Sequence, residues 1–233
     1  MLTNTAIKNN IAQARKRIAA AEKKFNKSAR SVLLLAVSKT QPASAILTAL
    51  AQQQFHFGEN YLQEALDKID TLQDHPITWH YIGAIQSNKT RPIALHFDWV
   101  HSVSSLKVAN RLSTQRPATL PDLNICLQFN VSEEGSKSGA TLEELSALAT
   151  DVASLPRIKL RGLMAIPQKA ATFEQQRATF HQVQQAQQYL IDAGHPLDTL
   201  SLGMSADLEA AIAAGSTMVR IGSAIFGPRK TAS

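Results

Sequence analysis

Residues 32–40 read Val-Leu-Leu-Leu-Ala-Val-Ser-Lys-Thr, and this stretch decides the fold class. Six consecutive apolar residues are typical of a strand that is buried on both faces, as in a parallel sheet covered by helices. Ser38, Lys39 and Thr40 follow without a glycine. A doubly wound open sheet often has a glycine-rich phosphate turn at this position, so the sequence favours a barrel over that alternative.

The rest of the chain alternates short apolar runs with segments of helical period. Seven further strands are expected at residues 55–58, 78–82, 98–102, 123–131, 160–164, 199–202 and 218–221. Helices are expected at residues 3–27, 42–54, 62–72, 106–114, 142–154, 172–193 and 206–214. Such alternation favours parallel strands joined by right-handed crossovers. It predicts a (β/α)8 TIM barrel with an extra N-terminal helix, in one domain over residues 1–233.

Charge and composition limit the function classes. The net charge of +6 is scattered, without runs of cations or interleaved aromatic residues, so we expect no nucleic-acid partner. The densest basic cluster, residues 15–27, also contains Glu22 and is typical of a solvated helix face. The chain has no long apolar segment and no apolar signal core, which predicts a cytoplasmic protein without a membrane partner.

The single cysteine, Cys126, lies in an apolar run and is expected to be a buried core residue. One thiol forms neither an internal disulfide nor a cysteine-based zinc site. The chain also has no His-Glu-x-x-His motif, and we expect no metal site. The glycine motifs of nucleotide-binding loops and the Gly-x-Ser-x-Gly motif of esterases are missing as well.

Candidate functional residues lie at the ends of the predicted strands, where TIM barrels carry their sites. Lys39 directly follows an apolar strand. Burial lowers the pKa of a lysine, and a neutral amine attacks an aldehyde to form a Schiff base. A lysine that only extends its ammonium into water is the alternative. Asn60, after the second strand, offers a donor and an acceptor to a ring substituent, or else caps a helix.

Two stretches after the last strands have the composition of a phosphate site: Ser201-Leu-Gly-Met-Ser205 and Arg220-Ile-Gly-Ser-Ala-Ile-Phe-Gly227. Their glycines allow backbone N–H groups to approach an anion, although ordinary turns have a similar composition. Arg220 stays protonated, so beside a pyridine nitrogen it would keep that ring unprotonated. A phosphate clamp or a rim salt bridge fits its spacing equally well.

Three other polar residues are interpreted more plainly. His80 and His101 are expected to be hydrogen-bonded, partly buried histidines rather than metal ligands. Lys137 lies in a polar loop, where it is either solvent-exposed or placed to meet a phosphate or aldehyde at the mouth of the site.

Taken in order, these motifs resemble one family over nearly the whole chain. Ala-Val-Ser-Lys-Thr (36–40), Phe-Gly-Glu-Asn-Tyr-Leu-Gln-Glu (57–64) and Trp-His-Tyr-Ile-Gly-Ala-Ile-Gln-Ser-Asn-Lys (79–89) are similar to motifs of the pyridoxal phosphate homeostasis proteins, the YggS/PROSC family. So are residues 137–139, 161–167, 201–207 and 220–227.

The resemblance implies a barrel like the N-terminal domain of alanine racemase, with pyridoxal 5′-phosphate (PLP) held as a Schiff base on Lys39. It implies a phosphate site at Ser201, Gly222 and Ser223, with Arg220 facing the pyridine nitrogen. Asn60 would lie near the ring, and Met164 and Met204 would pack around the cofactor. Lys137 is a secondary candidate for the attachment of PLP.

The implied role is PLP (vitamin B6) homeostasis and amino-acid balance, with PLP-dependent apo-enzymes as recipients and no catalytic residue. A monomer is expected, because the swapped second domain of the racemases is missing. The alternative is a PLP-dependent amino-acid racemase, which needs a second base. Tyr61 and Tyr81 are the only tyrosines near strand ends. A Schiff-base aldolase without cofactor is a third interpretation.

Overall fold

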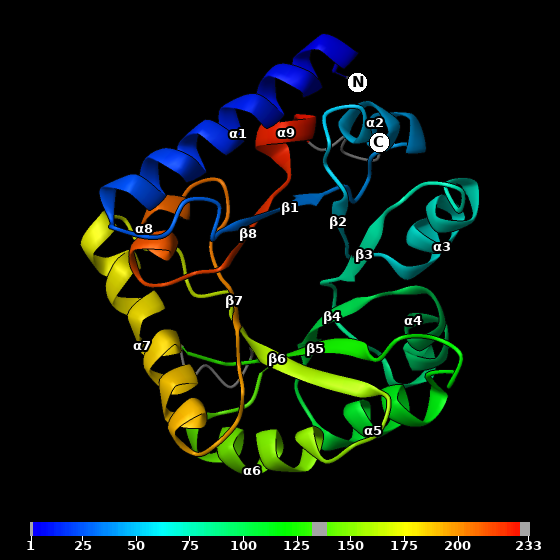
Figure 1. Cartoon of the computed structure of the whole chain (residues 1–233), viewed down its shortest axis with the longest axis vertical. Coiled ribbons are helices and arrows are strands. Elements are labelled where there is room, and N and C mark those ends of the chain that lie inside the picture. Colours follow the sequence, from blue (N-terminus) through cyan, green and yellow to red (C-terminus); the bar gives the residue numbers. More distant parts are fainter. Residues whose placement is uncertain (1, 132–138, 229–233) are drawn as a thin grey trace.

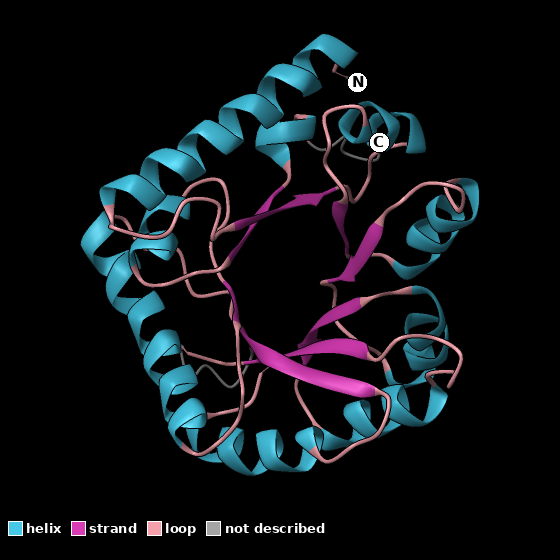
Figure 2. Cartoon of the chain, viewed as in Figure 1, coloured by secondary structure: helices cyan, strands magenta, loops and turns pink. Residues whose placement is uncertain are grey.

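The computed structural model describes residues 2–131 and 139–228, so Lys137 lies outside the described residues. Eight parallel strands close into a barrel in chain order, and β1 pairs with both β2 and β8. Figure 1 looks into this barrel, and Figure 2 shows the ring of strands surrounded by helices. The predicted TIM barrel is therefore confirmed, and an open sheet is excluded because Leu33 of β1 pairs with Met218 of β8.

The elements follow the predicted alternation. The strands are β1 (Leu33–Val37), β2 (His56–Glu59), β3 (Thr78–Tyr81), β4 (Trp99–Val103), β5 (Leu123–Gln128), β6 (Ile158–Met164), β7 (Thr199–Ser201) and β8 (Met218–Ile221). The helices are α1 (Asn4–Lys24), α2 (Ala43–Leu50), α3 (Leu62–Thr71), α4 (Thr90–His96), α5 (Leu106–Gln115), α6 (Leu142–Ala153), α7 (Phe173–Asp192), α8 (Leu208–Ala213) and α9 (Ser223–Phe226), with a 3-10 turn η1 (Ser87–Lys89).

The differences from the sequence prediction concern short elements and ends. Helix α4 has seven residues and α9 has four, which is too few for a helical period to be visible in the sequence. Strand β5 ends at Gln128, three residues before the predicted end. These differences leave the order of strands unchanged.

The N-terminal helix α1 is the extra helix that the sequence predicts. It buries the predicted face, made of Ile7, Ile11, Ala14, Ile18 and Ala21. Figure 1 shows α1 lying across the outside of the barrel next to α8 and α9. Helix α1 therefore covers the seam where the last strand closes onto the first.

Glu22 of α1 corrects the expectation that this part of the helix is a solvated face. Its exposed fraction is only 4%. One carboxylate oxygen accepts the backbone N–H of Val32 at 2.8 Å, and the other accepts that of Arg30 at 3.1 Å. The acid ties the end of α1 to the chain that enters β1, because these N–H groups precede the ladder and need an acceptor.

Replacing Glu22 by alanine should leave these N–H groups without their acceptor. We expect Glu22→Ala to lower the free energy of unfolding by about 2–4 kcal/mol, measured by urea denaturation. The exposed neighbour supplies the control, and Lys23→Ala should change stability by no more than about 0.5 kcal/mol. Equal effects of the two substitutions would contradict an anchoring role for Glu22.

Candidate functional site

A cavity of about 310 Å³ opens at the C-terminal ends of the strands. It is lined by Val37, Lys39, Gln41, Asn60, Ile82, Met164, Ile166, Met204, Ser205, Ala206, Arg220, Gly222, Ser223 and Gly227. The fold thus brings together seven of the eight residues that the sequence predicts for the cofactor. They come from the ends of five strands far apart in the chain, as expected of a barrel site.

Ser201 is the predicted residue that does not line this cavity. It is the last residue of β7, fully buried, and its hydroxyl bonds to Arg220 and His101, both at 2.9 Å. Ser205, four residues later in the same motif, lies in the loop and lines the cavity instead. Which of the two serines lies in the loop depends on where β7 ends. The sequence predicts that end one residue too late.

Lys39 and Asn60 lie on one side of the cavity. Lys39 is half-buried and lies two residues after the end of β1. The side-chain oxygen of Asn60 is buried and has no hydrogen-bond partner. A buried amide oxygen without a partner is costly, so this position calls for a donor from a bound group. Asn60 is not the N-cap of α3, since that position is Tyr61.

Arg220 lines the same cavity as a buried cation on β8, the strand that pairs with β1. Its guanidinium donates to the backbone oxygen and the hydroxyl of Ser201, and to the backbone oxygen of Ala165 at 3.0 Å. Burial lowers the pKa of Arg220 to about 10, while Asp207 opposes that shift. Arg220 therefore remains protonated at neutral pH, in a fixed orientation at the cavity wall.

Behind Arg220, three histidines cross the barrel interior in a hydrogen-bonded chain. His101 Nδ1 lies 2.9 Å from the Ser201 hydroxyl, and His101 Nε2 lies 3.0 Å from His80 Nδ1. His80 Nε2 in turn lies 3.1 Å from His56 Nδ1. Sequence reasoning predicted hydrogen-bonded histidines but missed this chain. Its signal is one histidine in each of three consecutive strands.

The direction of the chain is set by Arg220, because a guanidinium only donates. The Ser201 hydroxyl accepts from Arg220, and its own buried hydrogen also needs an acceptor, so we assign it to His101 Nδ1. Each following ring then donates from Nε2 to Nδ1 of the next, a tautomer assignment that satisfies every partner. Burial, with the Arg220 charge, lowers the pKa of His101 to about 3. Burial and its two neighbouring rings hold the pKa of His80 well below its ordinary value.

The loop after β7, which lines part of the cavity, is fixed by a tightly packed glycine and by a carboxylate that accepts a backbone N–H. Gly203 has a φ of +87°, and a Cβ there would lie 2.5 Å from the Cβ of Ala211. Asp207, the N-cap of α8, accepts the backbone N–H of Met204 at 2.6 Å.

Met204 is 40% exposed at the mouth, whereas Met164 is buried and packs with Trp99 and Cys126. The core position predicted for Cys126 is confirmed, since it is fully buried.

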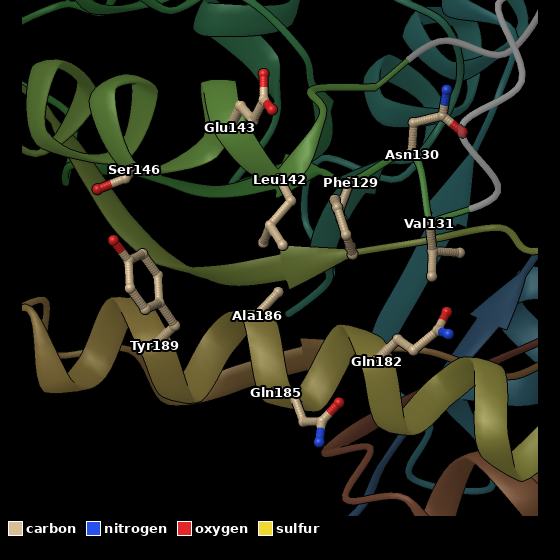
Figure 3. A pocket seen from close by; sticks show the side chains of 10 residues that line it. All are labelled: Phe129, Asn130, Val131, Leu142, Glu143, Ser146, Gln182, Gln185, Ala186 and Tyr189. Carbon is tan, nitrogen blue, oxygen red and sulfur yellow. The ribbon is translucent and has the colours of Figure 1, made fainter.

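A larger cavity lies elsewhere. It measures about 820 Å³ and lies between α6 and α7, outside the ring of strands (Figure 3). Ala186 and Tyr189 of α7 face Leu142 and Ser146 of α6 across it. None of the eight predicted cofactor residues lines it. Size alone would select this cavity, but convergent charged and polar groups mark the smaller one as the candidate site.

Residues 2–131 and 139–228 contain neither a candidate metal site nor a candidate membrane span. Within them, no three His, Cys, Asp or Glu side chains are grouped so that they could hold a metal ion. In the same part of the chain, no helix has both the length and the apolar character needed to cross a bilayer.

Known proteins match the chain closely. The family described as alanine racemase, N-terminal domain, matches residues 3–230. A protein of Pseudomonas aeruginosa named pyridoxal phosphate homeostasis protein is 56% identical over 225 residues, 97% of this chain and 96% of the relative. The Escherichia coli protein of that name is 53% identical over 226 residues, 96% of this chain and 97% of the relative. This chain belongs to the pyridoxal phosphate homeostasis proteins.

A solved structure adds a neighbour with a bound ligand. PipY of Synechococcus elongatus, in a structure with PLP bound, is 36% identical to the chain with a TM-score of 0.82. The match covers 95% of this chain and all of PipY. PipY therefore shares this barrel over the length of the chain. The resemblance stated from the motifs is confirmed by the named relatives.

The histidine chain generates a pH-dependent prediction. At pH 7, His80→Leu should lower the free energy of unfolding by about 1–3 kcal/mol, because the flanking rings lose their partners. Below the ordinary pKa of 6.5, the unfolded wild-type chain binds a proton at His80 that the folded state excludes. As the pH falls below this value, the free energy of unfolding of the wild type decreases by about 1.4 kcal/mol per pH unit through His80. The variant has no histidine at this position and lacks this decrease.

The gap between the two proteins should therefore narrow from pH 7 to pH 5, in urea denaturation at each pH. His75→Leu, at an exposed loop position, controls for the change in composition. A gap that stays constant over this range would show that His80 binds its proton equally well in both states.

Proposed function

We propose that this protein binds PLP as a Schiff base on Lys39 and takes part in PLP (vitamin B6) homeostasis and amino-acid balance. The observation that carries the proposal is the meeting of an amine, an unpartnered amide oxygen and a buried cation in one cavity. Lys39, Asn60 and Arg220 supply these groups. The relatives' names and the PLP bound to PipY support the same ligand.

The residues present fit PLP. The unpartnered oxygen of Asn60 suits a donor on the ring. Arg220 suits the pyridine nitrogen for two reasons. Its bonds to the Ser201 hydroxyl and the Ala165 carbonyl fix the guanidinium. The guanidinium also stays protonated and only donates hydrogen bonds, so it pairs with an unprotonated nitrogen. Gly222 and Ser223, together with Ser205, form the side that suits the phosphate. We propose that Ser205, rather than the predicted Ser201, binds the phosphate. Ser201 would contribute indirectly, by holding Arg220 in place.

The covalent step belongs to Lys39. Its neutral Nζ adds to the aldehyde carbon, a C=N bond replaces the C=O bond, and the oxygen leaves as water with the two amine protons. When bound, PLP supplies the aldehyde for this reversible capture and a ring that withdraws electrons. Arg220 would keep the ring nitrogen unprotonated. The ring would then withdraw electrons less strongly, which favours storage of PLP over catalysis.

The described lining supports a non-catalytic role. Lys39 and Arg220 are the titratable side chains among the described residues of this lining. Tyr61 is 52% exposed, and the Tyr81 hydroxyl donates to the backbone oxygen of Ala84 at 3.1 Å. Neither tyrosine lines the cavity. A racemase needs a second base on the opposite face of the substrate carbon.

The wider proposal concerns the setting of the protein. Residues 1–233 would act as a single, monomeric domain in the cytoplasm, and PLP-dependent apo-enzymes would receive the cofactor. The buried, unpaired Cys126 is consistent with a reducing compartment. Lys137 stays a prediction as a secondary attachment site. Light scattering tests the monomer, and mixing the loaded protein with an apo-enzyme tests transfer.

Removal of the amine tests the attachment site. Lys39→Ala should abolish the borohydride-reducible adduct with PLP, because no C=N bond forms without the amine. The measurement is mass analysis of the peptide that contains residue 39, after reduction and proteolysis. Wild type and Lys23→Ala, at an exposed position of α1, provide the comparison with Lys39 intact. A variant that still carries the reduced adduct would contradict sole attachment at Lys39 and direct attention to Lys137.

Asn60 should contribute to affinity without forming the covalent bond. We expect Asn60→Ala to weaken PLP binding by about tenfold, the size of one buried hydrogen bond. An absorbance titration with PLP measures the change. The reduced adduct on Lys39 should persist at high PLP. An unchanged affinity would remove Asn60 from the ring contacts.

A further inference from the structure

A buried ion cluster lies directly behind the two residues proposed to hold PLP. The ammonium of Lys68 on α3 donates to a Glu59 carboxylate oxygen at 2.8 Å and to Glu64 at 2.5 Å. Its third bond goes to the backbone oxygen of Ser38 at 2.8 Å. All three N–H groups of Lys68 are thus used, although its exposed fraction is only 5%.

The cluster also holds the chain on both sides of Lys39. The Ser38 hydroxyl donates to the same Glu59 oxygen at 2.6 Å. The backbone N–H of Thr40 donates to Glu64 at 2.6 Å. The two peptide groups that flank Lys39 are therefore bound to one cluster, the first through its carbonyl oxygen and the second through its N–H.

Strand geometry explains why the cluster and the cavity stay separate. Successive side chains along a strand point to opposite faces. Ser38 and Glu59 point outward, to Lys68 on the surrounding helix, while their chain neighbours Lys39 and Asn60 line the cavity. Lys39 and Asn60 thus each directly follow a residue of the cluster, Ser38 and Glu59 respectively.

Thr40 adds an independent sign that the backbone is held in place. Its φ is +63°, in the left-handed region that a β-branched residue rarely adopts. Such a conformation persists only where its surroundings impose it, and such residues gather at ligand sites. In this conformation the Thr40 N–H donates to Glu64, so the cluster contacts the residue with the unusual φ.

We propose that Lys68, with Glu59 and Glu64, is a positioning device that fixes Lys39 and Asn60 for PLP. None of the three touches the cavity, so they act through the backbone. The inference rests on the proposed function, because it assigns these residues to PLP binding. A site held to within about 0.5 Å needs such supporting contacts, and a misplacement of about 1 Å costs on the order of 100-fold in productive encounters.

The test compares two substitutions on the same helix. Lys68→Met removes the ammonium and keeps an unbranched chain of similar length. Leu72→Ala removes a buried side chain, 2% exposed, at the end of α3 and leaves the cluster intact. Urea denaturation shows how far each substitution destabilises the full-length protein. Glu64→Ala, at a half-buried position, serves if Lys68→Met does not fold.

Two readouts are taken on each protein. The first is the dissociation constant of PLP from an absorbance titration. The second is the hydrogen exchange rate of the Thr40 amide without PLP, which reports the backbone beside Lys39. We expect Lys68→Met to raise the dissociation constant by about 10- to 100-fold and to speed Thr40 exchange by at least about tenfold. Leu72→Ala should stay within about threefold of wild type in both.

The outcomes separate the inference from the function on which it rests. If Lys68→Met binds PLP like wild type, or if Leu72→Ala weakens binding equally, the positioning role is wrong. If wild type itself takes up no PLP, the proposed function fails, and the role toward PLP fails with it. Thr40 exchange then shows only whether the cluster holds the backbone.

Discussion

One positive charge inside the barrel constrains much of this structure. A buried guanidinium is costly unless acceptors surround it, and Arg220 finds them in Ser201 and the backbone of Ala165. Ser201 then needs an acceptor for its own hydrogen, which His101 provides, and the requirement passes on to His80 and His56. A barrel interior is usually filled by branched apolar side chains. Here a line of polar groups replaces part of that packing, and the cation at its end faces the cavity.

The closure of the barrel brings the site together. Leu35 of β1 pairs with Arg220 of β8, so the lysine after β1 and the arginine near the end of β8 approach the same cavity from neighbouring strands. In an open sheet these two strands would be separated, and the amine and the cation would not share a ligand. Helix α1 packs against α8 and α9 over this seam, and Glu22 joins its end to β1.

Much of this arrangement is predictable from the sequence, for identifiable physical reasons. The apolar run of β1 and the alternation of strands and helices indicate a barrel, and a barrel places strand ends at one mouth. That placement was enough to predict Lys39, Asn60 and Arg220 at one site. What the sequence conceals is side-chain direction near strand ends. Ser201 and Ser205 look equivalent in the motif, yet one lies inside the barrel and the other in the loop. The burial of Glu22 and the cluster around Lys68 were concealed for the same reason, since both depend on tertiary contacts.

The pairing of the first strand with the last also has a consequence for biosynthesis. Lys39 is translated early, but its partner strand β8 is translated near the end of the chain, and Leu33 cannot pair with Met218 until then. A nascent chain on the ribosome therefore carries the amine of Lys39 before Arg220 and the loops after β7 and β8 are present. The cavity between the ends of β1 and β8 is therefore complete only after β8 has been synthesised and has paired with β1.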